Sequence, residues 1–452
     1  MSVPSRAAPA PAPAPAPRPP SPRLSAQHFA AAILYLLAGA TGLVWVAPEL
    51  AAGNYLSPHV AGVTHLFTLG WLTTTIFGAL YQLLPGALRT PVRWRRVAHL
   101  SFWSLAIGAG MFACGIASGS TLLHHGGIAL VGLGVILGVT NVAASAARAP
   151  VHDVMRGAVL LAITFLFSTL ALGVVLLHNI HTGFIAAARL RVLATHFHVA
   201  VAGWALIMIV GVSHRLLPMF LLAQGADNRW TKRSLSCLAA GVAVLAVGLN
   251  TGLGGATWIG VVLLESGVAF FLRQTYVFYR SRARKQIDVG LRFAATASAF
   301  MGAAAVLGPI VLWRGPAATR LAIAYAITGL LGGIVLYVVG FFYKIVPMMA
   351  WTARYGGLVS IAGRSPAPSV ADMYSPRVAV VQLIAMASGV VMLALSVLGG
   401  VSAGAWAGAV LFLGGVVLFV SQILRVALGG RALSFRPSRR SPDALSGAGG
   451  SL

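Results

Sequence analysis

The chain has 452 residues, of which 58% are hydrophobic and only 9% are charged. Soluble globular proteins average about 25% charged residues, so this composition excludes that class. The formal net charge of +25 would suit a nucleic-acid-binding protein, but the basic residues lie in short segments between long apolar runs. We therefore predict an all-α polytopic membrane protein that contacts a lipid bilayer and binds no nucleic acid.

The two ends of the chain differ from the apolar middle. Residues 1–24 are rich in proline and alanine and lack the apolar core of a signal peptide, so we predict a disordered tail. Residues 431–452 are predicted to form a second disordered tail, and residues 25–430 a membrane domain. The two cysteines, Cys114 and Cys237, lie far apart inside apolar stretches, which indicates neither a disulfide framework nor a zinc site.

Apolar runs of the length that crosses a bilayer predict twelve spanning helices. Their expected limits are 29–47, 60–84, 97–118, 123–146, 155–178, 193–217, 234–253, 256–279, 290–313, 320–346, 378–399 and 402–427. When basic residues are assigned to alternate connections, 28 of the 32 Lys and Arg fall on the side of the two termini. The positive-inside rule then predicts that both termini are cytoplasmic.

Three of these spans share a motif. HLFTLGWLTTTIFGALYQLLP (65–85), HVAVAGWALIMIVGVSHRLLP (198–218) and ITGLLGGIVLYVVGFFYKIVP (327–347) align without gaps, about 130 residues apart, each with a glycine seven residues before its proline. They are the second, sixth and tenth predicted spans. The sequence thus predicts three repeats of four helices, at 25–150, 151–285 and 286–430.

Histidines are concentrated in the first half of the chain, between His28 and His214. His65 and His198 occupy the same position of the aligned segments, about 30 Å from the proline at 1.5 Å per residue, so they should lie at equal depth. His196 projects about 200° around the helix from His198, so those two cannot bind one iron. A single intramembrane histidine can simply be hydrogen-bonded, whereas several at one depth favour a metal or haem site.

Twelve helices in quasi-threefold order, with an H-x-H followed by Gly-Trp and a terminal Leu-Pro, resemble subunit I of the haem-copper oxidases and nitric-oxide reductases. The chain is similar, more loosely, to NnrS-type haem- and copper-containing membrane proteins. The resemblance implies a bacterial inner-membrane protein in which His65 and His198 hold haem b and His196 faces a second haem, with copper as a further candidate. Possible partners are quinol, a periplasmic cytochrome or other membrane subunits.

The chain departs from that family at two places. Its H-x-H lies on the sixth helix, whereas the family carries the motif on the tenth, and residues 234–253 contain no histidine where the family has copper ligands. We therefore expect no complete oxidase centre. The expected function is electron transfer, as in an oxidoreductase, or binding of or response to a diatomic gas such as NO or O2.

Other residues leave alternatives open. His178 and His181 stand three apart on one helical face and could form a second metal site, for example for copper, or merely cap the helix end. Glu265 is the one acid deep in a predicted span, as an interhelical hydrogen-bond partner or a proton relay. A copper- or haem-handling transporter or permease is the alternative function, and a purely assembly-related role is a third.

Overall fold

The computed structural model describes residues 22–223, 225–362 and 369–429, and within them the regular elements are helices without any strand. Twelve helices are long and apolar enough to cross a membrane, which confirms the predicted all-α, multi-pass character. Each predicted span overlaps one of them, and the other limits agree to within five residues, but the first and sixth helices begin seven residues before the predicted 29 and 193, and the tenth continues ten residues beyond the predicted 346. The first helix begins at Pro22, slightly before the predicted start of the membrane domain.

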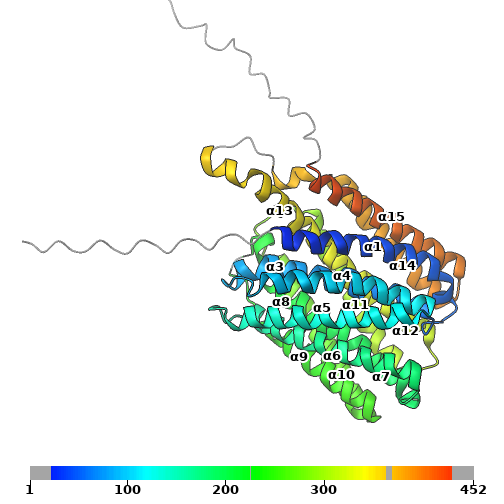
Figure 1. The fold of residues 1–452 in the computed structure, drawn as a ribbon. Coiled ribbons are helices and arrows are strands. Elements are labelled where there is room, and N and C mark those ends of the chain that lie inside the picture. The colour runs from blue at the N-terminus through cyan, green and yellow to red at the C-terminus, as the bar shows by residue number, and fades with distance from the viewer. Residues whose placement is uncertain (1–21, 224, 363–368, 430–452) are drawn as a thin grey trace, which may run out of the picture.

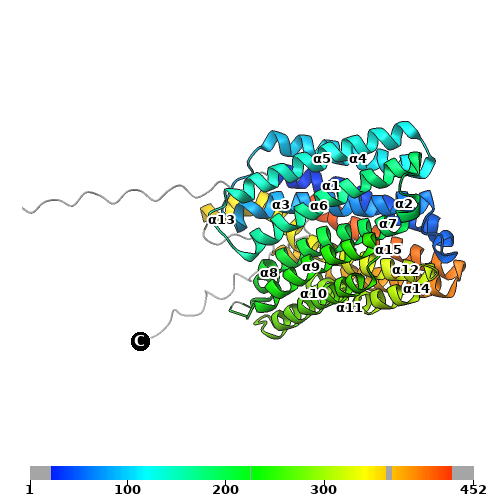
Figure 2. The same ribbon diagram turned by 90° about the horizontal axis from the view of Figure 1, so that it is seen from below.

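Nine of the spanning helices are continuous: α1 (Pro22–Ala51), α4 (Arg95–Ser118), α5 (Thr121–Ala147), α6 (Val154–Thr182), α9 (Arg229–Thr251), α10 (Gly254–Arg280), α11 (Val289–Arg314), α14 (Pro376–Gly399) and α15 (Ser402–Ala427). Figures 1 and 2 show the spanning helices running roughly parallel in one bundle. Two 3-10 turns, η2 (Ala186–Ala188) and η5 (Val370–Met373), lie in connections. We call the end of the bundle at which α1 begins the basic end, because Arg93, Arg229 and Arg284 lie there.

The second, sixth and tenth spans are each divided by a π-helical segment. They are α2–η1–α3 (Pro58–His65, Leu66–Thr73, Thr74–Ala87), α7–η3–α8 (Arg189–His198, Val199–Leu206, Ile207–Leu221) and α12–η4–α13 (Thr319–Ala326, Ile327–Val335, Leu336–Ala362). η1 and η3 begin immediately after His65 and His198, and η4 begins at Ile327, which aligns with those histidines. π-helical turns are rare and concentrate at functional sites. The apolar pattern of the sequence did not predict them.

Three hairpins of neighbouring helices pack with their backbones almost touching. A Cβ on Gly127 of α5 would lie 2.4 Å from Phe112 N, and one on Gly260 of α10 would lie 2.4 Å from Leu245 N. The α14–α15 hairpin makes the matching approach, between Gly408 and Leu393 N. Each hairpin turns at a left-handed glycine that caps its first helix: Gly119, Gly252 and Gly400, with φ of 70°, 75° and 71°. An L residue with a side chain rarely adopts this conformation.

Polar side chains recur at matching places in these hairpins. Ser101 Oγ donates to Gly134 O at 2.7 Å, and Ser234 Oγ, 133 residues later, donates to Gly267 O at 2.7 Å. At the basic end, an Asn or Gln side chain on the second helix of each hairpin forms a hydrogen bond with the start of the first helix. Its amide oxygen accepts a backbone N–H from a residue in the first turn of that first helix or just before it. These pairs are Trp94 with Asn141, Thr231 with Gln274, and Ser375 with Gln422.

Gly127→Ala is expected to destabilise the protein, because the new methyl group would meet the backbone of Phe112 in the facing helix. Overpacking of this kind costs about 1–3 kcal/mol. Gly132→Ala in the same helix is the matched control, since a Cβ at that position would have nothing within 4 Å and alanine favours the helix. Thermal unfolding in detergent should show a lower Tm for Gly127→Ala alone. Equal Tm values for the two variants would contradict the close packing.

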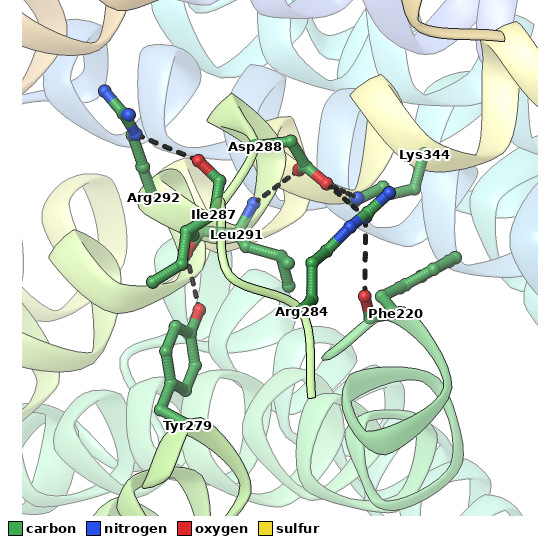
Figure 3. A network of polar contacts seen from close by, with 8 residues as sticks. All are labelled: Phe220, Tyr279, Arg284, Ile287, Asp288, Leu291, Arg292 and Lys344. Carbon is green, nitrogen blue, oxygen red and sulfur yellow. Dashed lines mark hydrogen bonds and ion pairs between the residues drawn. The ribbon is translucent and has the colours of Figure 1, made fainter. Parts of the chain in front are cut away.

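A polar network joins three spans at the basic end (Figure 3). Asp288 caps α11 by accepting the N–H of Leu291, and its other oxygen pairs with Arg284 at 2.9 Å and with Lys344 of α13. Lys344 lies over the ring of Phe220 in α8, and Arg284 also donates to the Phe220 carbonyl. Asp288 therefore links the α10–α11 connection to the ends of the sixth and tenth spans that lie at the basic end.

Candidate functional site

An apolar cavity of about 210 Å³ lies among the second to sixth spans, in the half of the bundle away from the basic end. Leu, Ile, Val and Phe side chains from five helices form most of its wall. Its polar lining residues are Tyr55, His65, Thr68, Thr73, His124, Thr169, Arg189 and His196. At the inner limit of the cavity, Trp204 Nε1 of η3 donates to Thr73 Oγ1 of η1 at 3.2 Å, which ties the two π-helical segments together.

The imidazoles of His65 and His196 face each other in this cavity. Their ring centroids are 6.5 Å apart and their planes are inclined by 36°. His65 ends α2, and its Nδ1 donates to the Ala61 carbonyl at 2.8 Å. That bond fixes the ring orientation and the tautomer, leaving the Nε2 lone pair of His65 available to a ligand.

His196 reaches the cavity from α7, one turn before η3 begins. Its Nδ1 is buried and has no hydrogen-bond partner among the described residues. The ring passes close to Gly173 of α6, where a Cβ would lie 3.4 Å from His196 Cε1. A Cβ at this position would be in ordinary van der Waals contact with the ring, so Gly173 marks where His196 packs against α6. The Thr169 backbone of α6 also interacts with this imidazole.

His198 points the other way. Its Nδ1 donates to the Ala194 carbonyl at 2.7 Å, and its Nε2 accepts a hydrogen bond of 3.2 Å from the Tyr325 hydroxyl of α12. The structure thus brings His65 together with His196, and it does not bring His65 together with His198 as the sequence led us to expect. The two rings of the H-x-H do project from different sides of the helix, as their 200° separation predicted.

The His65–His196 and His198–Tyr325 contacts show the same two-residue offset between aligned segments. His65, His198 and Ile327 share one position of the aligned segments, and His196 and Tyr325 share the position two residues earlier. His65 meets His196 of the next segment, and His198 meets Tyr325 of the segment after that. Each of these two histidines therefore faces the earlier position on the following segment. The prediction that His65 and His198 lie at equal depth says nothing of which residues face each other, so it could not predict this offset.

The second metal site suggested by His178 and His181 gains no further ligands in the part of the chain that is described. His178 is exposed at the end of α6, with its ring 5.2 Å from that of Phe184. The side chain of His181 lies outside the described residues. No group of three or more His, Cys, Asp or Glu that could hold a metal ion is found in the described ranges.

Glu265 lies near the His198–Tyr325 pair and outside the cavity. A Cβ on Gly308 of α11 would lie 2.8 Å from Glu265 Oε1 and 3.5 Å from Tyr325 Cε2, so the two side chains share one narrow space. Glu265 Oε2 is buried, and it makes no hydrogen bond among the residues described. The interhelical hydrogen bond considered for this acid is thus not found at Oε2.

The His65–His196 pair fits the axial ligation of a haem. Two metal–nitrogen bonds of about 2 Å each, plus about 1 Å from each nitrogen to its ring centre, place two such imidazoles roughly 6 Å apart. The observed separation of 6.5 Å is close to this value. The donors are imidazoles, which haem iron accepts, and the apolar wall suits the faces of a porphyrin.

Arg189 is a site residue that the sequence alone did not reveal. It lines the cavity at the N-terminus of α7 and is the one Lys, Arg, Asp or Glu among the lining residues. In the sequence it looks like an ordinary charged residue between two spans, and only its seven-residue spacing from His196 indicates a shared helix face.

Neither protein-family models nor curated protein sequences give a match to this chain.

Proposed function

We propose that this protein binds haem b in the cavity between the second and sixth spans, with His65 and His196 as the axial ligands. The observation that carries the proposal is the pair of imidazoles facing each other across an apolar cavity, 6.5 Å between centroids. This assignment keeps two of the three histidines expected from the sequence. His198 becomes a hydrogen-bond partner of Tyr325.

Both axial positions would be filled by protein side chains, which favours electron transfer over the binding of a diatomic gas. When bound, haem supplies one-electron redox chemistry. The chain's own residues would orient the rings, through the His65–Ala61 hydrogen bond, and exclude water with the apolar wall. Quinol, a periplasmic cytochrome or another membrane subunit would be the redox partner.

We also propose that the twelve helices form three repeats of four, in a bacterial inner membrane with both termini cytoplasmic. The recurring features support this arrangement: the π-helical segments, the close hairpin glycines and the serine-to-carbonyl bonds. The concentration of Lys and Arg at the basic end supports the orientation. Such repeats would put His65 and His196 on neighbouring units, with His196 two residues before the position equivalent to His65.

A copper-handling protein is the second candidate, because the two imidazoles of His65 and His196 are also suitable copper ligands. A bare ion needs much less space than the cavity offers, and its mostly apolar wall would leave the ion poorly solvated. The observations favour the larger, apolar ligand.

A reduced-minus-oxidised visible spectrum of the purified full chain tests the proposal. We expect a sharp α-band of b-type character and about one haem per protein in a pyridine haemochrome assay. Elemental analysis of the same sample measures copper. Stoichiometric copper without haem would favour the copper-handling candidate. If protein supplied with haem contains neither haem nor copper, both candidate functions are overturned.

A further inference from the structure

We propose that the α9–α10 hairpin binds the headgroup of an anionic phospholipid at the basic end of the bundle. The site is formed by arginine and aromatic side chains that the two helices bring together, and we call it the arginine–aromatic cluster. Its members are Arg229, Trp230, Arg233, Phe270, Arg273 and Tyr276. The proposal is independent of haem binding.

Aromatic rings form the floor of the cluster. Trp230 of α9 stacks on Phe270 of α10, with ring centroids 5.6 Å apart and planes inclined by 26°. Arg229 and Arg233 both lie over the Trp230 ring, at 5.0 and 4.8 Å from its centroid. Since the face of a ring attracts the guanidinium itself, the N–H groups at the guanidinium edge stay available to a ligand.

A third guanidinium joins this pair from the neighbouring helix. Arg273 lies over the ring of Tyr276 at 5.4 Å. It follows Phe270 by three residues, so it shares a face of α10 with the ring that stacks on Trp230. All three arginines are exposed, which a surface that binds a membrane lipid requires.

The positive charge of the cluster exceeds the negative charge that the protein places beside it. Arg229 and Arg233 share one indole, so their guanidinium carbons lie within about 10 Å of each other and repel. Asp227 pairs with Arg229 at 2.9 Å, whereas the described residues place no carboxylate within ion-pair distance of Arg233 or Arg273. An anion that bridges the arginines would relieve the repulsion, and guanidinium groups bind phosphate through paired hydrogen bonds.

The other two hairpins lack this cluster, although they share the fold of α9–α10. The close backbone approaches at Gly127, Gly260 and Gly408 fix the register between the hairpins. In that register each hairpin has an arginine at the position of Arg229, namely Arg96 and Arg377. The other five positions hold Val97, Leu100, Leu137, Thr140 and Ala143 in the first hairpin, and Val378, Val381, Leu418, Ser421 and Leu424 in the third. The cluster is therefore particular to α9–α10 and is not repeated at every basic helix end.

The depth of the cluster indicates a lipid rather than an acidic protein or a nucleic acid. Arg273 precedes Arg280, the last residue of α10, by seven residues, so it lies about 10 Å inside the end of the helix at 1.5 Å per residue. Farther from the basic end, the same face of α10 carries Val262 and Ile259, which are 61% and 58% exposed. A phosphate at the arginines would thus have its acyl chains beside apolar surface. Basic sites between spanning helices are suited to anionic lipid headgroups.

Native mass spectrometry of the full chain in detergent tests the proposal, by titration with phosphatidylglycerol or with phosphatidylcholine of identical acyl chains. Phosphatidylcholine carries the same phosphate beside a cationic choline, which the arginines repel. We expect the wild type to prefer phosphatidylglycerol by about tenfold, as for one hydrogen bond between ionised groups. The double variant Arg233→Gln/Arg273→Gln should lose most of that preference. Trp230→Leu, which changes no charge, should lose part of it because the guanidinium groups lose their platform.

Arg95→Gln/Arg96→Gln is the matched control, because it removes two exposed arginines from the same end of the bundle in a hairpin without the cluster. It should keep the wild-type preference, and equal Tm values should show that the variants fold. Equal binding of the two lipids by the wild type, or an equal loss of preference in the two double variants, would refute a specific site. Displacement of phosphatidylglycerol by millimolar inorganic phosphate would show that the cluster binds free phosphate, and the lipid assignment would be wrong.

Discussion

His65→Ala and His196→Ala are each expected to abolish the low-spin b-type spectrum of the purified protein, whereas His198→Ala keeps it. Each of the first two substitutions removes one of the two imidazoles that face each other in the cavity. The third removes a ring that is hydrogen-bonded to Tyr325 instead. The measurement is the α-band of the reduced protein together with the haem-to-protein ratio.

His198→Ala is a closely matched control, because it lies on the same helix, two residues from His196, and has the same change of side chain. Size-exclusion profiles and Tm values should show that all three variants fold. Loss of the spectrum in His198→Ala with retention in His196→Ala would reverse the assignment and restore the pairing expected from the sequence. Retention in both His65→Ala and His196→Ala would exclude that pair as the ligands.

Asp288→Ala is expected to destabilise the protein by roughly 3 kcal/mol, since it removes a helix cap and leaves Lys344 without its counter-charge. The side chain of Lys344 is only 12% exposed, so water cannot fully replace the lost carboxylate. A fall of several degrees in Tm in detergent is the expected readout. The haem spectrum should be unchanged at temperatures where the protein is folded, because the network lies at the basic end.

Asp153 provides the matched comparison. It caps α6 as Asp288 caps α11, and its partner Arg215 occupies the aligned position of Lys344. Arg215 is 49% exposed and the pair is 3.5 Å apart, so Asp153→Ala should cost less, about 1 kcal/mol. Adding Lys344→Met to Asp288→Ala should recover part of the loss by removing the unpaired charge. Equal losses in the two single variants, with no recovery, would show that the cap and not the ion pair is responsible.

The twelve spans could be predicted from the sequence because their signal is local. A run of apolar residues long enough to cross a bilayer has few possible structures other than a membrane-spanning helix. The breaks between such runs carry Arg, Pro or Gly. His65 and His196 were also among the expected ligands, since neutral imidazoles within spans are informative. These inferences need no knowledge of how one helix faces another.

The partner of His65 could not be predicted in the same way, because it depends on the rotation of each helix about its axis. The alignment equates His65 with His198, but equivalent residues of successive units point in equivalent directions and so do not face each other. His65 instead meets the residue two positions earlier on the next segment. Arg189 escaped notice for a related reason, since nothing local distinguishes it from Arg191.

The three π-helical segments have a consequence for how these spans tolerate length changes. A π turn accommodates one more residue than an α turn, and one residue corresponds to about 100° of helical phase. Deleting a single residue from η1 would let the span become a regular helix and leave His65 at nearly the same angle relative to Pro85, because the widened turn absorbs the extra residue. An insertion or deletion outside these segments would instead rotate one half of the span against the other by about 100°.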